Sequence, residues 1–115
     1  CALGAVVGDA TVDRLRCRIV AGAANNVLAE PRHGEALEAR GILYAPDYVV
    51  NAGGLVFLEE EILGHEAATA TLRVRGVGAH VARVIEHARR EGISTTRAAA
   101  AIANERLAAA RRSGV

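Results

Sequence analysis

A strand–helix–strand pattern within residues 18–45 constrains the fold of this chain more than any other feature. The short apolar run at 18–23 ends in small residues, which predicts a buried strand that leads into a loop. Residues 34–40 have helical composition and are followed by Gly41, and 42–45 predicts a second strand that a proline halts. Two strands joined through a helix are normally parallel, with a right-handed crossover. The chain is therefore expected to have an α/β fold.

The remainder of the chain is predicted to be mostly helical, after a polar, glycine-containing loop at 47–54. Helices are expected at 55–63, at about 70–91 and at about 94–112. Apolar residues in the second of these recur at steps of three and four, which is typical of a helix with one buried face. Two parallel strands form too small a sheet to be covered by themselves, so a further strand is expected before Cys1.

The charge and composition exclude several classes of protein. Fourteen basic and thirteen acidic residues leave a net charge of +1, and 3% of the residues are aromatic, which disfavours an Arg-rich nucleic-acid binder. No apolar run approaches the ~20 residues of a membrane span, so no membrane partner is expected. Cys1 and Cys17 fit no zinc spacing, and the four histidines form no facial metal set. We therefore expect reduced thiols, a cytoplasmic location and no metal.

Three loops are expected to share one edge of the predicted sheet, because the carboxyl ends of parallel strands lie on the same side and commonly form the ligand site. They are residues 1–5, 23–26 and 47–54. Each contains small residues that permit close approach of the backbone to a ligand. The second and third contain Asn, whose amide both donates and accepts hydrogen bonds. This combination suits a nucleotide together with a small polar substrate.

The residues of these loops resemble the NAD-binding domain of the Glu/Leu/Phe/Val amino-acid dehydrogenases. The similarity is carried by Cys-Ala-Leu-Gly-Ala at 1–5, Ala-Gly-Ala-Ala-Asn-Asn at 21–26 and Gly-Ile-Leu-Tyr-Ala-Pro-Asp-Tyr-Val-Val-Asn-Ala-Gly-Gly at 41–54. Asn25 is followed by Asn-Val-Leu, where the glutamate dehydrogenases continue with a Gly-Pro-Thr type segment. The chain therefore resembles the leucine, valine and phenylalanine branch, and covers only the C-terminal portion of the family.

The resemblance implies an α/β fold, namely the second half of a Rossmann-type parallel sheet (a βαβ unit) followed by C-terminal helices. Residues 1–69 would form part of the NAD-binding domain, and residues 70–115 would form helices that pack on it. The resemblance also implies NAD-dependent oxidative deamination of a branched-chain L-amino acid, leucine or valine, to the 2-oxo acid and ammonia. The amino acid is then the small-molecule partner, and the full-length protein is expected to be a homo-oligomer.

The same resemblance implies roles for five residues. Ala2 and Leu3 would lie against the ribose and pyrophosphate of NAD. Ala24 and Asn25 would approach the nicotinamide ribose or carboxamide. Asn51 would reach the amino or carboxylate group of the substrate. Structural alternatives are a helix cap or Asx turn for Asn51, a turn for Asn25, and a loose terminus for Ala2 and Leu3.

No catalytic residue is expected within this chain. The family's two catalytic lysines and an aspartate belong to a substrate domain without a counterpart here, and the sequence contains no lysine. The isolated chain is therefore expected to be inactive. The alternative is a non-catalytic remnant that self-associates through its exposed sheet edge as an interaction module. Two further expectations are structural: Asp47 hydrogen-bonds to backbone, and the acidic run at 59–61 forms a solvated helix face.

Overall fold

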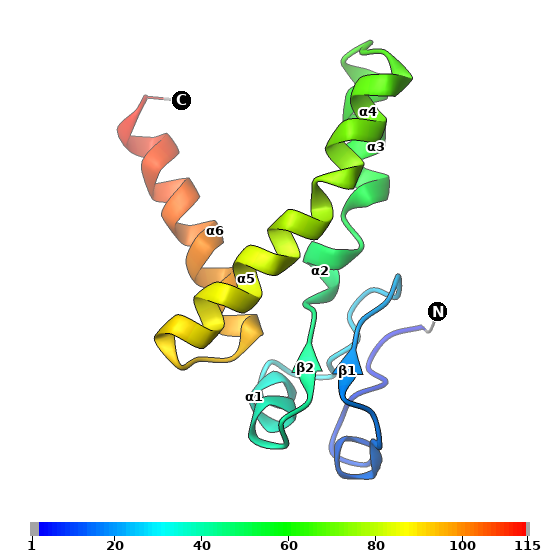
Figure 1. Ribbon diagram of the computed structural model, residues 1–115, viewed down its shortest axis with the longest axis vertical. Coiled ribbons are helices and arrows are strands. Elements are labelled where there is room, and N and C mark those ends of the chain that lie inside the picture. The colour runs from blue at the N-terminus through cyan, green and yellow to red at the C-terminus, as the bar shows by residue number, and fades with distance from the viewer. Residues whose placement is uncertain (1–2, 115) are drawn as a thin grey trace.

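The structure is a computed structural model that describes residues 3–114 (Figure 1). Within this part of the chain, a short 3-10 helix precedes two strands that flank one helix, and five further helices follow. The elements are η1 Val12–Arg14, β1 Ile19–Val20, α1 Arg32–Ala39, β2 Leu43–Tyr44, α2 Asp47–Val50, α3 Gly53–Ile62, α4 Ala67–Arg75, α5 Val77–Glu91 and α6 Thr95–Arg112.

The predicted strand–helix–strand unit is present as β1, α1 and β2. The two strands pair in parallel, with Ile19 opposite Leu43. Each strand is two residues long, because the chain turns into a loop at Ala21 after β1 and into α2 soon after β2. A separate parallel bridge joins Val7 to Leu28. The mixed α/β class with a small parallel sheet is confirmed.

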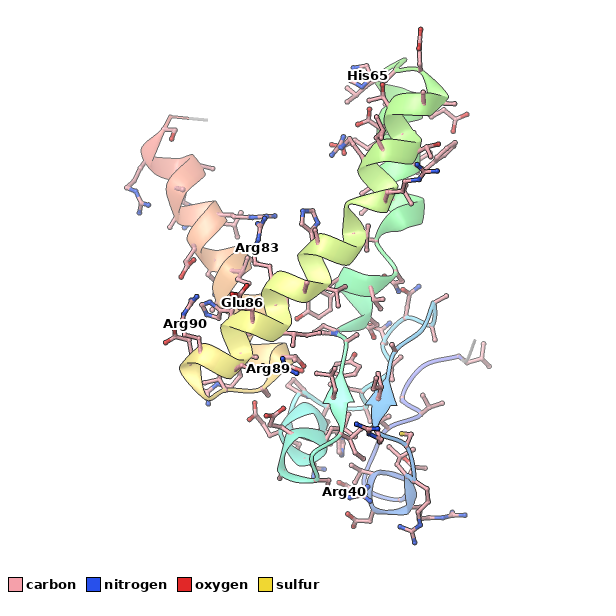
Figure 2. The ribbon with its side chains drawn as sticks, in the orientation of Figure 1. Arg40, His65, Arg83, Glu86, Arg89 and Arg90 are labelled. Atoms are coloured by element: carbon pink, nitrogen blue, oxygen red, sulfur yellow. The ribbon has the colours of Figure 1, made fainter. Side chains whose placement is uncertain are left out.

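The core of this unit consists mainly of aliphatic side chains, as the low aromatic content predicts. Its buried members are Val7, Val12, Val27, Leu37, Ile42 and Tyr44. Arg40, just after the last residue of α1, donates hydrogen bonds to the carbonyl oxygens of Val12 and Leu15 (Figure 2). These hydrogen bonds connect η1 and Leu15, the residue after it, to the end of α1 at the edge of the core.

The segment 47–54, predicted to be a loop, is instead largely helical. It contains the whole of α2 and the start of α3, which begins at Gly53. Pro46 has φ −53° and ψ 127°, so the chain enters α2 from an extended residue, and the carboxylate of Asp47 accepts a hydrogen bond from the Tyr48 N–H. The β-branched and glycine residues of this segment lower its intrinsic helix propensity, and these local contacts override that preference.

The single helix predicted at about 70–91 is two helices, α4 and α5, which meet at Gly76. A Cβ atom on Gly76 would lie 3.0 Å from the carbonyl oxygen of Arg73, which is closer than ordinary van der Waals contact. Glycine also has a low helix propensity and commonly marks bends. The break allows α4 to pack along α3, while α5 packs against α2 and α6 (Figure 1).

The start of α6 is fastened to β2 and α1. Thr95 Oγ1 donates to the carbonyl oxygen of Tyr44 at 2.6 Å, and Ser94 Oγ donates to Glu35 Oε1 at 2.7 Å. Ser94 also caps α6 by accepting a hydrogen bond from the Arg97 N–H, as the sequence predicts for Ser94 or Thr95. A second apolar cluster lies between α5 and α6 and consists of Val84, Ala88, Ala98 and Ala99.

The α3–α4 hairpin extends away from the sheet and contains a buried carboxylate. Glu60 is 1% exposed, whereas the acidic run that contains it was expected to be solvated. Its carboxylate lies 2.7 Å from His65 Nδ1 and accepts a hydrogen bond from Arg73 on α4. His65 lies at the far end of this hairpin (Figure 2). The pairing across two helices explains why Glu60 is buried while Glu59 and Glu61 face solvent.

None of the helices described here is both long enough and apolar enough to span a membrane.

Candidate functional site

The first two of the three predicted loops lie against each other. The Ala5 N–H donates to the carbonyl oxygen of Asn26 at 2.6 Å. Gly4 has φ +102°, and a Cβ there would lie 3.2 Å from the carbonyl oxygens of both Asn25 and Asn26. Glycine is therefore required at this position both by its backbone angle and by the close approach of the second loop.

Asn51 connects the second loop to the third. It lies at the end of α2, and its Nδ2 donates to Asn25 Oδ1 at 2.5 Å and to the carbonyl oxygen of Ala24 at 3.4 Å. Asn51 is half-buried and Asn25 is exposed, so their amides border solvent. The three loops thus form one continuous surface at the carboxyl ends of β1 and β2, as the parallel pairing requires.

Asp47 lies beneath this surface, inside the protein, and supports it through hydrogen bonds. Its carboxylate is buried and accepts hydrogen bonds from two backbone N–H groups, Val27 at 2.7 Å and Tyr48 at 2.6 Å. Its own N–H donates to Tyr44 Oη at 3.2 Å. The expectation that Asp47 hydrogen-bonds to backbone is confirmed. Burial of the Tyr44 hydroxyl raises its pKa to about 12, so it stays protonated at neutral pH.

A cleft of about 190 Å³ opens beside these residues. Its lining is formed mostly by small and aliphatic side chains at the ends of the two strands, and consists of Val6, Val20, Ala21, Gly22, Ala23, Ala24, Val27, Tyr44, Ala45 and Asp47. A Cβ added to Gly22 would meet no atom within 4 Å, so the space next to this loop is open. Such small walls allow a ligand to approach the backbone of this loop closely.

The structure brings together three of the five residues to which the sequence assigned roles. Ala24, Asn25 and Asn51 are in direct contact. Leu3 is fully exposed near the start of the described chain, and Ala2 lies outside the described residues. Neither Gly4 nor Tyr44 was predicted from the sequence as a residue of the site. The glycine within the first loop was a usable signal for Gly4, whereas nothing local marks Tyr44 as the partner of Asp47.

Metal-binding chemistry finds no support in the described part of the chain, where no three His, Cys, Asp or Glu side chains gather into a possible metal site. Cys17 is an exposed free thiol.

Comparison with known proteins identifies the family. The sequence profile of the Glutamate/Leucine/Phenylalanine/Valine dehydrogenases matches residues 1–114. The chain belongs to this family. The resemblance seen in the loops at 1–5, 21–26 and 41–54 is therefore confirmed.

Individual relatives are amino-acid dehydrogenases with several substrates. The chain is 49% identical over 107 residues to a leucine dehydrogenase of Thermoactinomyces intermedius, covering 93% of this chain and 29% of that protein. It is 42% identical to a phenylalanine dehydrogenase of Caldalkalibacillus thermarum, covering 93% of this chain and 29% of that protein. The crystal structure of an L-tryptophan dehydrogenase from Nostoc punctiforme superimposes with a TM-score of 0.91 at 37% identity, covering 97% of this chain and 34% of that one. The chain thus spans about a third of the length of these relatives.

Proposed function

We propose that this chain is part of an NAD-dependent dehydrogenase that deaminates a branched-chain L-amino acid, leucine or valine, to the 2-oxo acid and ammonia. The observation that carries the proposal is the contact of Asn51 with Ala24 and Asn25 at the carboxyl ends of the strands, in a chain of this family. In an open α/β sheet this edge is where a nucleotide and its substrate meet.

The proposed role of each residue follows from its position in the site. Ala24 and Asn25 would hold the nicotinamide end of the cofactor, which accepts a hydride from the substrate when bound. The half-buried amide of Asn51 would bind the amino or carboxylate group of the amino acid. Because Asn51 is hydrogen-bonded to the loop that holds the cofactor, it would orient the substrate relative to that loop. Ala2 and Leu3 would contact the ribose and pyrophosphate.

An aliphatic substrate is supported by the residues that follow Asn51. The first turns of α3 carry two exposed aliphatic side chains, Leu55 at 73% and Leu58 at 49% exposure. Leu55 follows Asn51 by four residues along the chain, and covering an exposed leucine with an apolar ligand group would be favourable because both lose contact with water. Four leucine dehydrogenases are 45–49% identical to the chain, two phenylalanine dehydrogenases are 42% and 43% identical, and a further leucine dehydrogenase is 39% identical. We therefore propose leucine or valine rather than an aromatic amino acid.

The isolated chain is proposed to be inactive. The family's catalytic lysines would have to come from a part of the enzyme outside these residues, because the chain contains no lysine. The intact enzyme, meaning the complete polypeptide that carries this stretch, is proposed to be a cytoplasmic homo-oligomer. Its activity is tested directly by following NAD reduction with leucine, valine and phenylalanine. A preference for phenylalanine, or no reduction with any of them, would contradict the proposal.

We predict that Asn51→Ala in the intact enzyme damages substrate use more than cofactor binding. The loss of a hydrogen bond to a charged substrate group, and of the orientation that it provides, should lower kcat/KM for leucine about 100-fold. The dissociation constant of NAD should rise less, by at most about tenfold, because Asn25 and Ala24 lose only their hydrogen bonds from Asn51. Steady-state kinetics and a fluorescence titration with NAD measure the two effects. Asn104→Ala, at an exposed position on α6, is the matched control and should change neither. Equal losses in both quantities would refute the substrate role of Asn51.

A further inference from the structure

Asp47 places a carboxylate inside the protein without a cationic partner. Asp47 is 8% exposed, and none of the ion pairs within residues 3–114 includes it. A buried carboxylate is costly unless N–H donors replace the lost water. The two donors here differ in their distance along the chain: Tyr48 is the next residue, whereas Val27 lies 20 residues away, directly after the second loop. The hydrogen bond from Tyr48 is local to the start of α2, whereas the hydrogen bond from Val27 joins α2 to a distant part of the chain.

The Val27 N–H belongs to the same peptide group as the carbonyl of Asn26. That carbonyl accepts the hydrogen bond from Ala5 N–H at 2.6 Å, so the peptide group is held at both its oxygen and its nitrogen. Asn26 has φ +53°, a left-handed conformation that asparagine adopts more readily than most residues other than glycine. The hydrogen bonds from Ala5 to the Asn26 carbonyl and from Val27 to Asp47 hold this turn in place. Asn25 directly precedes Asn26 in the same turn.

Asp47 also starts the helix that ends at Asn51. Its N–H is held by Tyr44 Oη at 3.2 Å, and its carbonyl oxygen accepts from the Asn51 N–H at 2.9 Å. One residue thus contacts the turn that carries Asn25 and the helical turn that carries Asn51. Asp47 therefore supports both sides of the direct hydrogen bond between the Asn25 and Asn51 amides.

We infer that Asp47 is a positioning residue of the proposed dehydrogenase site, whose carboxylate joins the turn at 24–26 to α2 and so aligns the groups that bind cofactor and substrate. This inference rests on the proposed function. Asp47 acts through Val27 and Asn51, and is not itself assigned a contact with either ligand. A one-ångström change in such an alignment is enough to lower a reaction rate about 100-fold.

Asp47→Asn in the intact enzyme tests this inference. The amide has the shape of the carboxylate, but its NH2 group cannot accept a hydrogen bond, so one of the two N–H groups loses its acceptor. We expect kcat with leucine to fall about 10- to 100-fold and KM for NAD to rise at least about threefold. The matched control is Thr95→Val, which removes the buried hydrogen bond to the carbonyl oxygen of Tyr44 at the end of β2. It should lower the melting temperature but leave kcat and KM within about twofold of wild type.

Asp47→Ser removes the hydrogen bond from Val27 while it keeps a polar side chain, and it serves as the test if Asp47→Asn does not fold. The serine hydroxyl is one bond closer to the backbone than the carboxylate oxygens, so it does not reach the Val27 N–H. Kinetic losses in Asp47→Ser similar to those expected of Asp47→Asn support the bridge to Val27. If the Asp47 variants fold with a lower melting temperature, as Thr95→Val does, but retain wild-type kcat and KM, Asp47 has only a structural role and the inference is overturned. An inactive wild-type enzyme would instead refute the proposed function, and the inference with it.

Discussion

At the scale of single residues, Tyr44 links the core to the candidate site. Its ring belongs to the buried cluster beneath the sheet, its carbonyl oxygen accepts from Thr95, and its hydroxyl accepts from the Asp47 N–H. Burial disfavours the charged phenolate, which raises the pKa of Tyr44 to about 12. One aromatic residue therefore connects α6, β2 and the start of α2.

We predict that Tyr44 makes the stability of the protein sensitive to alkaline pH. An unfolded tyrosine loses its proton near pH 10, whereas the folded one holds it to about pH 12. Stability from this group is therefore complete below about pH 10 and decreases as the pH rises towards 12. Tyr44→Phe should reduce this decrease, with a remainder from Tyr48, whose pKa is also raised by burial. The change should cost about 1 kcal/mol at pH 7 because the Asp47 N–H loses its acceptor.

The measurement is the thermal midpoint of the intact enzyme between pH 7 and 11, for wild type and Tyr44→Phe. Tyr48→Phe is the control at pH 7, because no hydrogen bond of the Tyr48 hydroxyl is present in the described structure. A wild type and a Tyr44→Phe variant that lose stability in parallel above pH 10 would contradict the assignment.

The sequence predicted the polar atoms of the site better than their supports. Asn25 and Asn51 were identifiable because asparagines after apolar strands stand out, and the topology of a parallel sheet brings such loops together. A glycine within the first loop could also have indicated Gly4, but Tyr44 was not identifiable in this way. Its importance depends on contacts with residues far away in the sequence, and a tyrosine in a strand has the same local pattern whether or not its hydroxyl has a partner.

At the scale of secondary-structure elements, the α3–α4 hairpin depends on its internal ion pairs. Arg73 on α4 pairs with the buried Glu60 and, at 2.9 Å, with the exposed Glu59. The apolar stripe of α3 contributes little to packing here, since Leu55 and Ile62 are 73% and 76% exposed. The ion pairs of Arg73 therefore join the two helices in addition to the packing of Ala70 on α4, which is 2% exposed.

We predict that Arg73→Ala loosens the hairpin. The change leaves the carboxylate of Glu60 buried with His65 as its remaining side-chain partner, and should cost about 1–3 kcal/mol, reduced from a fully buried pair because Arg73 is 46% exposed. Amide hydrogen exchange in α3 and α4 should become faster. Arg75→Ala removes a neighbouring arginine of the same helix that has no ion pair within the described residues, and should have little effect. Equal effects of the two variants would contradict this role of Arg73.

Element types were predictable from the sequence where periodicity and terminators agreed. The crossover unit and α6 follow the predicted ranges closely, because Gly41 and Ser94 mark an end and a start by known local chemistry. The break at Gly76 was missed because the apolar period continues across it. The burial of Glu60 was missed because three consecutive glutamates are typical of a solvated face, and only the position of α4 determines which one is enclosed.

At the scale of the whole molecule, the chain is more extended than its length requires. Its radius of gyration is 15.6 Å, against about 13 Å for a compact domain of this size. The second half of α6 diverges from α4 (Figure 1), and an apolar groove of about 590 Å³ runs between α2, α5 and α6. Leu107, which lines this groove, is 57% exposed. Several leucines of the α3–α4 hairpin are also exposed, at 49–73%. So much exposed apolar surface favours association.

We predict that the 115-residue chain, expressed alone, self-associates. Light scattering after size-exclusion chromatography should give a mass above 12.0 kDa that rises with concentration. Leu107→Arg should reduce association if the groove between α5 and α6 is the contact, and Ile62→Arg should do so if the hairpin is. Both positions are exposed, so neither change is expected to disturb the core. A monomer with a sharp thermal transition at about 100 µM would show that the small sheet and two apolar clusters suffice for a stable fold, because in that case the exposed leucines would not require a partner to keep the chain folded.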